Sequence, residues 1–166
     1  MLAYAGVAVA YADIYQRYQS WKFEQMSPAS AAADLQDGDL VGRLEIPRVG
    51  ISVMVLQGTE DRTLAIGAGH VPGTPIPGAQ GNVAIAAHRD TFFRNLKEIQ
   101  PGDNIQFSTV YRTYNYVVDS METVNPDDTR VLETRDSSEL TLITCFPFYF
   151  VGSAPKRFIV HAKPMK

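Results

Sequence analysis

The chain has one cysteine among its 166 residues and no block of basic residues. A single thiol excludes a disulfide framework and any zinc site built from several thiolates. Fifteen Lys and Arg against 18 Asp and Glu give a formal net charge of -3, so the positive patch that phosphate backbones require is missing. We therefore expect one domain with an ordinary hydrophobic core and no nucleic-acid partner. Its lone thiol is either buried and inert or a nucleophile.

The amino end also lacks a long apolar run. Residues 1–12, MLAYAGVAVAYA, are apolar, whereas a membrane span needs about 20 such residues. A signal peptide would begin with a positively charged segment, and none precedes this run. We therefore interpret residues 1–26 as a helix that either begins a soluble domain or is the remnant of a membrane anchor.

Apolar residues of this segment recur at alternating steps of three and four, which places them on one helical stripe. They are Tyr4, Val7, Tyr11, Ile14, Tyr18 and Trp21. The stripe predicts a helix that packs on the globular part or continues a membrane helix. A helix pair between two chains is the alternative.

Residues 27–39 are small, polar and turn-prone, which predicts a linker, and residues 40–166 then form the globular domain. This domain is predicted to be mainly β, with a sheet that closes on itself or folds into a sandwich. The alternation of apolar and polar residues predicts strands at 40–47, 51–56, 82–88, 104–110, 113–124, 139–145 and 156–162. Short helical turns are expected at 60–65, at 91–99 with Asp90 or Thr91 as cap, and at 127–133.

Cys145 ends the predicted strand ELTLITC, and Pro147 then interrupts the pairing. A loop of about ten residues leads to the strand KRFIVHA. If these two strands pair antiparallel, Arg157 lies beside Cys145. A guanidinium there would favour a thiolate and could hold the oxygen of a carbonyl under attack. Without that neighbour, Arg157 would be an ordinary charge at a strand edge.

A thiol nucleophile needs a general acid and base, and histidine titrates in the right range. His88 ends the predicted strand NVAIAAH, as Cys145 ends its own strand, so the two side chains can meet at one end of a barrel. His70 lies in a glycine-rich loop, where a turn or surface role is typical. His161 is expected to be partly buried.

Three segments carry a family resemblance. TLITC resembles the signature strand of the sortases, AAHRDTFFRNL the segment with their catalytic histidine, and APKRFIVHA the segment with their catalytic arginine. The likeness extends over about residues 42–163, and the amino-terminal extension and the residues after Cys145 resemble class D members. It implies a closed eight-stranded barrel with a few short helices, and a cysteine transpeptidase outside the cytoplasmic membrane, anchored through its amino end in the full-length protein.

The resemblance also implies roles for single residues. Cys145 would be the nucleophile, His88 the general acid and base, and Arg157 the group that stabilises the substrate or oxyanion. Thr144, His70 and Phe146 would contact the substrate. The substrates would be surface proteins bearing a carboxy-terminal LPxTG-like sorting signal, cleaved after its threonine, and an amine acceptor such as a cell-wall peptide.

Two other functions stay open from the sequence. A noncatalytic barrel that binds exported peptides would show the same strands with a structural thiol. A cysteine transpeptidase that crosslinks peptidoglycan would also use Cys, His and Arg, but such enzymes usually show SHGC around the nucleophile. No cofactor is expected. A calcium site could form only if the loops carrying Glu60, Asp61, Asp127 and Asp128 converge.

Overall fold

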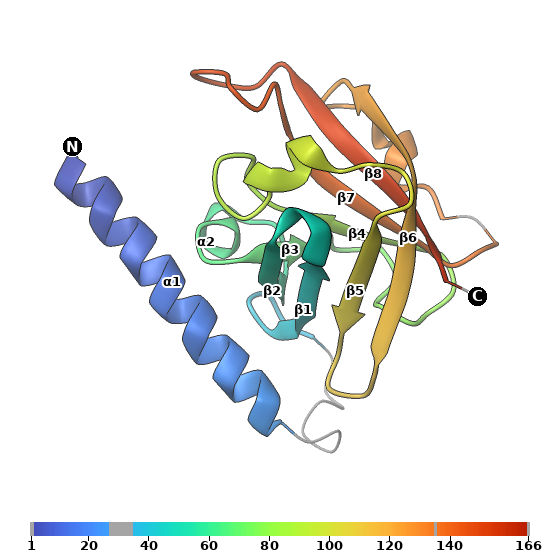
Figure 1. The fold of residues 1–166 in the computed structure, drawn as a ribbon, viewed down its shortest axis with the longest axis horizontal. Helices are drawn as coiled ribbons and strands as arrows, with labels where there is room; N and C mark the ends of the chain where they lie inside the picture. Colours follow the sequence, from blue (N-terminus) through green and yellow to red (C-terminus); the bar gives the residue numbers. More distant parts are fainter. Residues whose placement is uncertain (1, 27–34, 135, 166) are drawn as a thin grey trace.

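The computed structural model describes the backbone of residues 2–26, 35–134 and 136–165. Within these residues, eight strands close into one barrel in the order β1-β2-β3-β4-β7-β8-β6-β5 (Figure 1). The strands are β1 (Leu40–Ile46), β2 (Ile51–Gln57), β3 (Ala68–His70), β4 (Asn82–Ala86), β5 (Asn104–Ser108), β6 (Thr113–Val124), β7 (Glu139–Phe146) and β8 (Lys156–Pro164). The predicted β class and the closed eight-stranded barrel are confirmed.

Alternation along the strands produces the barrel interior. In β7, Leu140 and Leu142 are fully buried in the main core, because successive side chains point to opposite faces of the sheet. Ile143 belongs to the other face and packs on a smaller cluster around Ile159. The parity that sends the leucines inward therefore sends Cys145 to the outer face, at the end of its strand.

Strand β3 was not predicted from the sequence. It has only three residues, and its glycine-rich sequence AGH carries no alternation of apolar and polar residues. It nevertheless closes the barrel, because it pairs parallel to β2 and antiparallel to β4.

The three expected helical turns are present but shorter: α2 (Asp61–Leu64) and the 3-10 helices η3 (Arg94–Glu98) and η4 (Thr129–Leu132). A further 3-10 helix, η2 (Pro47–Val49), was not predicted. The expected capping of residues 91–99 by Asp90 or Thr91 is wrong: η3 begins after Phe93, with no side-chain cap. Phe93 and Leu96 are both fully buried, and the three-residue repeat of a 3-10 helix places them on one face.

Helix α1 (Leu2–Gln25) lies along the outside of the barrel (Figure 1). Residues 27–34, most of the predicted linker, lie outside the described residues. Across the described part of the chain, no helix combines the length and the hydropathy that crossing a bilayer requires.

Of the positions predicted for the apolar stripe of α1, packing on the globular part is wrong, whereas continuation of a membrane helix and a helix pair stay predictions. The described side chains of the stripe are more than half exposed: Val7, Tyr11, Ile14, Tyr18 and Trp21. The opposite face, which carries Gln16, meets the barrel instead. There the Gln16 side chain accepts a hydrogen bond from Met54 N at 2.7 Å and donates to Ile66 O. An amide that satisfies two backbone groups explains why this face is chosen, since unpaired backbone groups are costly when buried.

Candidate active site

Cys145 and Arg157 face each other across two paired strands. Strand β7 runs antiparallel to β8 in a register that makes these two residues direct partners. Partners in an antiparallel pair have side chains on the same face, about 5 Å apart at Cβ. The neighbourhood predicted from the sequence is therefore confirmed.

His88 reaches the same level through the other neighbour of β7. Each residue of β4 pairs with the β7 residue 57 positions later, up to Ala86 with Ile143. The chain continues in step, because Ala87 N donates a hydrogen bond to Ile143 O at 3.1 Å. Thr144 Oγ1 then donates to Ala87 O at 2.7 Å. His88 follows Ala87, and Cys145 follows Thr144. The shared register therefore places His88 and Cys145 side by side.

A pocket of about 300 Å³ contains the three side chains. Its lining residues are His88, Arg89, Asp90, Cys145, Gly152, Ser153, Ala154 and Arg157. The thiol of Cys145 is unpaired and only partly buried, so a peptide can approach it. Of the two guanidinium groups in the lining, that of Arg157 belongs to the strand partner of Cys145, so its donors can hold an oxyanion that develops there.

The Arg157 side chain is held by carbonyl oxygens of the residues just before it. Its Nη1 donates to Lys156 O at 3.1 Å and to Ala154 O at 3.4 Å. In the described part of the chain these two contacts use only Nη1, so the remaining donors of the guanidinium stay available to a ligand.

The three residues considered as substrate contacts lie outside this lining, as far as the described residues go. Thr144 is buried and hydrogen-bonded to Ala87 O. Phe146 stacks on Phe158 at 6.3 Å and meets Phe148 edge-on at 6.1 Å, and Phe148 and Phe158 pack against the main core. A substrate role for Thr144 and Phe146 stays a prediction.

The surface position expected for His70 is wrong. It ends β3 and is 2% exposed. Its Nδ1 lies 2.8 Å from Gln57 Oε1 and its Nε2 2.9 Å from Pro75 O. Burial lowers the pKa of His70, and the Pro75 carbonyl offsets part of this effect. These contacts give His70 a structural place in the barrel, and its substrate role stays a prediction.

Sequence reasoning missed Arg89. It lines the pocket, and its Nη2 donates to Phe150 O at 2.8 Å and to Gly152 O at 3.1 Å. In the sequence it is one more polar residue in the turn after β4, and no periodicity marks it. The only signal was its position directly after His88.

The described residues include no group of three or more His, Cys, Asp or Glu side chains that could hold a metal ion. Of the four carboxylates considered as calcium ligands, Glu60 pairs with Arg62, and Asp128 pairs with Arg130. The loops do not bring them together as a calcium site. That the protein needs no cofactor stays a prediction.

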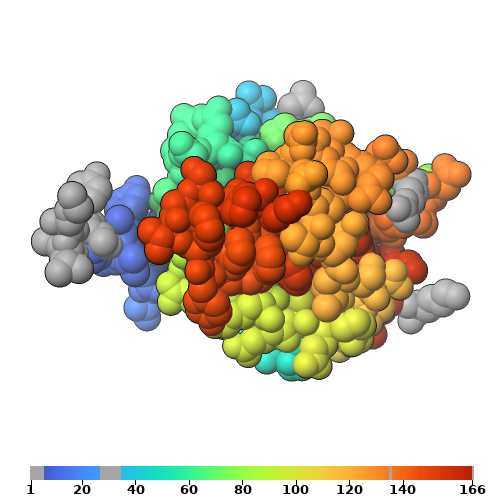
Figure 2. Space-filling view, turned by 90° about the horizontal axis from the view of Figure 1, so that it is seen from above, coloured from blue at the N-terminus to red at the C-terminus, as the bar shows by residue number. Residues whose placement is uncertain are grey.

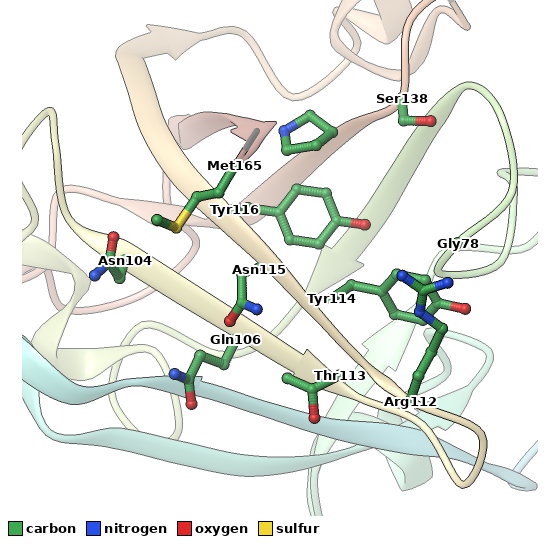
Figure 3. Close-up of a pocket in the computed structure, with 11 residues that line it drawn as sticks. Gly78, Asn104, Gln106, Arg112, Thr113, Tyr114, Asn115, Tyr116, Ser138 and Met165 are labelled. Carbon is green, nitrogen blue, oxygen red and sulfur yellow. The ribbon is translucent and has the colours of Figure 1, made fainter.

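A larger hollow, of about 630 Å³, lies around the β5–β6 hairpin and the end of β8 (Figure 3). There the Arg112 guanidinium lies 5.0 Å from the centre of the Tyr114 ring. Asn115 and Gln106 are partners across β6 and β5 and also line the hollow. This hollow contains neither the thiol nor His88, so its size does not make it the candidate active site.

Known proteins are similar to this chain in both sequence and fold. The family model described as a sortase domain matches residues 44–165. Sortase D of Bacillus subtilis (strain 168) is 34% identical over 129 residues, which cover 77% of this chain and 65% of that protein. The chain thus spans slightly less than two thirds of the length of that relative.

Solved structures give the same result. A sortase D5 transpeptidase of Clostridium perfringens superposes with a TM-score of 0.81 and 26% identity, over 95% of this chain and 99% of that one. A sortase C of Clostridium perfringens, solved with the C-terminal cell wall sorting motif, has a TM-score of 0.74 and 25% identity, over 80% of this chain and 74% of that one.

Proposed function

Because the chain belongs to the sortase family, we propose that it is a cysteine transpeptidase that cleaves a peptide sorting signal and joins the cleaved protein to an amine. The observation that carries this proposal is the shared register of three strands. It brings a thiol, an imidazole and a guanidinium to one pocket at the end of β4 and β7 and the start of β8.

The first half of the reaction forms a thioester. The thiolate of Cys145 attacks the carbonyl carbon of the threonine in an LPxTG-like signal, and the Arg157 guanidinium holds the developing oxyanion. The carbon–nitrogen bond breaks, and the leaving amine takes a proton from His88.

The second half regenerates the enzyme. The acceptor amine loses a proton to His88 and attacks the thioester, so that a new amide forms and Cys145 leaves as the thiolate. Storing the acyl group on sulfur divides one difficult amide exchange into two easier steps.

We also propose that the protein acts at the cell surface, on surface proteins with a carboxy-terminal sorting signal and with a cell-wall peptide as acceptor. The sorting-motif complex of the Clostridium perfringens sortase C supports the substrate class. The likeness to sortase D and to the D5 transpeptidase supports a class D-like member. Anchoring through the amino end stays a prediction.

The test uses mass spectrometry of the intact protein with sorting-signal peptides. We expect an acyl adduct on Cys145 that consists of the peptide up to its threonine, and release of a transpeptidation product when an amine is added. Cys145→Ala and His88→Ala should yield neither the adduct nor the product. Folded protein that forms no adduct with any member of a varied peptide library would overturn the proposal.

Neither alternative function gains support. A peptide-binding barrel without catalysis predicts no adduct in the same experiment. A peptidoglycan-crosslinking enzyme predicts acylation by stem peptides and none by sorting signals. Nothing in the described residues favours either one.

A further inference from the structure

One wall of the Cys145 pocket is a loop with little support of its own. Residues 147–155 connect β7 to β8 and contribute Gly152, Ser153 and Ala154 to the lining. The middle of the loop projects from the molecule, and Tyr149 and Val151 are 84% and 99% exposed. Figure 2 looks down on this side of the molecule, and there the orange-red loop lies next to the yellow-green segment that follows β4. A wall of this kind keeps one shape only if another part of the protein holds it.

Arg89 makes this connection. Through Nη2 it donates to two carbonyl oxygens on either side of the exposed tip, Phe150 O at 2.8 Å and Gly152 O at 3.1 Å. Its guanidinium also lies 5.9 Å from the centre of the Phe150 ring. Gly152 has a φ of +98°, a left-handed conformation that turns the chain back toward β8. One side chain thus bridges the turn, and hydrogen bonds from a charged donor are strong ones.

The contacts of Arg89 are not arranged for its own stability. Its Nη1 is buried and has no hydrogen-bond partner among the described residues. A buried donor without a partner is costly and calls for an explanation. The position of Arg89 offers an explanation. It directly follows His88, so its side chain joins the segment that carries the imidazole to the loop that forms another wall of the pocket.

We propose that Arg89 is a positioning residue that holds the β7–β8 loop as the wall of the Cys145 pocket. Peptide binding then depends on Arg89, while the chemical step at Cys145 does not. This inference rests on the proposed function for its substrate. The state of the loop can be measured without any substrate.

A second cation touches the same loop and separates the two effects. Lys97 donates a hydrogen bond to the hydroxyl of Tyr149, and its Nζ lies 4.9 Å from the centre of that ring. Neither residue lines the pocket. Lys97 therefore contacts the loop at Tyr149, outside the pocket lining, whereas Arg89 holds the stretch that includes Gly152 of the lining.

The first experiment measures the loop itself. Chymotrypsin cleaves after exposed aromatic residues, and mass spectrometry identifies cuts at Tyr149 and Phe150. We expect Arg89→Ala to be cut there at least about fivefold faster than the wild type, because proteolysis follows the opening of the loop. The matched control is Arg94→Ala, which removes one charge from the same segment, where Arg94 bonds only to Asp90 O among the described residues. It should be cut at the wild-type rate.

The second experiment separates binding from chemistry with a sorting-signal peptide. Arg89→Ala should raise KM roughly tenfold, the effect of losing one hydrogen bond to a charged group, and leave kcat within about twofold. Arg89→Lys keeps the charge and one donor, so it should recover part of the KM. Lys97→Ala should leave both constants near the wild-type values.

The outcomes distinguish the two proposals. If Arg89→Ala leaves loop cleavage unchanged, or if it lowers kcat without raising KM, the positioning role is wrong. If the wild type forms no adduct with any peptide while Arg89→Ala still loosens the loop, the tether stands and the transpeptidase proposal fails. Should Arg89→Ala fold poorly, the same comparisons are made with Arg89→Lys against Arg94→Lys. A loop no more sensitive to protease in Arg89→Lys would overturn the inference.

Discussion

Thr144 and Ala87 are joined by a hydrogen bond of 2.7 Å from the threonine hydroxyl to the alanine carbonyl. Each residue directly precedes a member of the proposed catalytic pair. Strand β4 formally ends at Ala86, so this side-chain bond extends the alignment of the two segments beyond their regular pairing. We therefore expect this bond to fix how His88 lies relative to Cys145.

Thr144→Val tests that relationship. Valine keeps the shape of threonine and removes the hydroxyl, so the carbonyl of Ala87 loses its partner and His88 is free to shift. We expect kcat to fall by roughly tenfold to a hundredfold, because small misplacements of reacting groups are costly. Steady-state kinetics with a sorting-signal peptide measures the effect.

The chain offers a matched control for this prediction. Thr141 lies on the same strand, is equally buried, and donates to Asn82 Oδ1 at 2.7 Å. Thr141→Val should destabilise the barrel to a similar degree and leave kcat of the folded enzyme unchanged. Equal kcat losses in both variants would show that the Thr144 bond serves stability alone.

Arg157→Lys separates the charge of the guanidinium from its geometry. Lysine keeps the positive charge but lacks the planar fork that can hold an oxyanion. We expect kcat/KM to fall by about 10² to 10³, the range for loss of one oxyanion donor. Arg130→Lys is the control, because Arg130 pairs with Glu122 and Asp128 outside the pocket. A lysine variant as active as the wild type would restrict Arg157 to an electrostatic role.

His70 makes stability depend on pH. Burial lowers the pKa of His70 in the folded state, so below about pH 6.5 the unfolded chain binds a proton that the folded chain resists. The free energy of unfolding is therefore full above that pH and falls as the pH drops toward the folded-state pKa. The slope from one site is at most about 1.4 kcal/mol per pH unit.

Urea unfolding measures this effect as the change in the free energy of unfolding between about pH 8 and about pH 5. The change should be smaller in His70→Gln than in the wild type. Asp103 and Glu122 also titrate with lowered pKa values, because Arg48 bonds to the first and His161 to the second. Their stabilisation is lost only below about pH 4.5, where unfolded carboxylates begin to protonate. A parallel slope in wild type and variant would assign the effect to other groups.

Gln16 should decide whether helix α1 stays on the barrel. Gln16→Ala removes the amide that bonds to Met54 N and Ile66 O. We expect faster hydrogen exchange throughout residues 6–25, because few other contacts hold the helix. Arg17→Ala is the control, since Arg17 is exposed on the next position. Unchanged exchange in the Gln16 variant would mean that the remaining contacts, such as that between Arg43 and Glu24, are sufficient.

Helix α1 shows where pattern reasoning from sequence fails. The regular spacing of Tyr11, Ile14 and Tyr18 allowed packing on the globular part, yet these side chains are exposed. Hydrophobic periodicity identifies a helix and its apolar side, but it does not say which surface is nearby. Here backbone groups at Met54 and Ile66 needed partners, and a glutamine on the other side of the helix provided them.

Local chemistry along the chain was enough to predict seven of the eight strands and the meeting of Cys145 with Arg157. Both follow from alternation and from one antiparallel connection, which depend on neighbouring residues. The burial of His70 and the tether from Arg89 to Phe150 and Gly152 could not be predicted in this way. They depend on closure of the barrel, which joins segments about 60 residues apart in the case of Arg89. Contacts of that range carry no periodic signal, so they exist only once the sheet has closed.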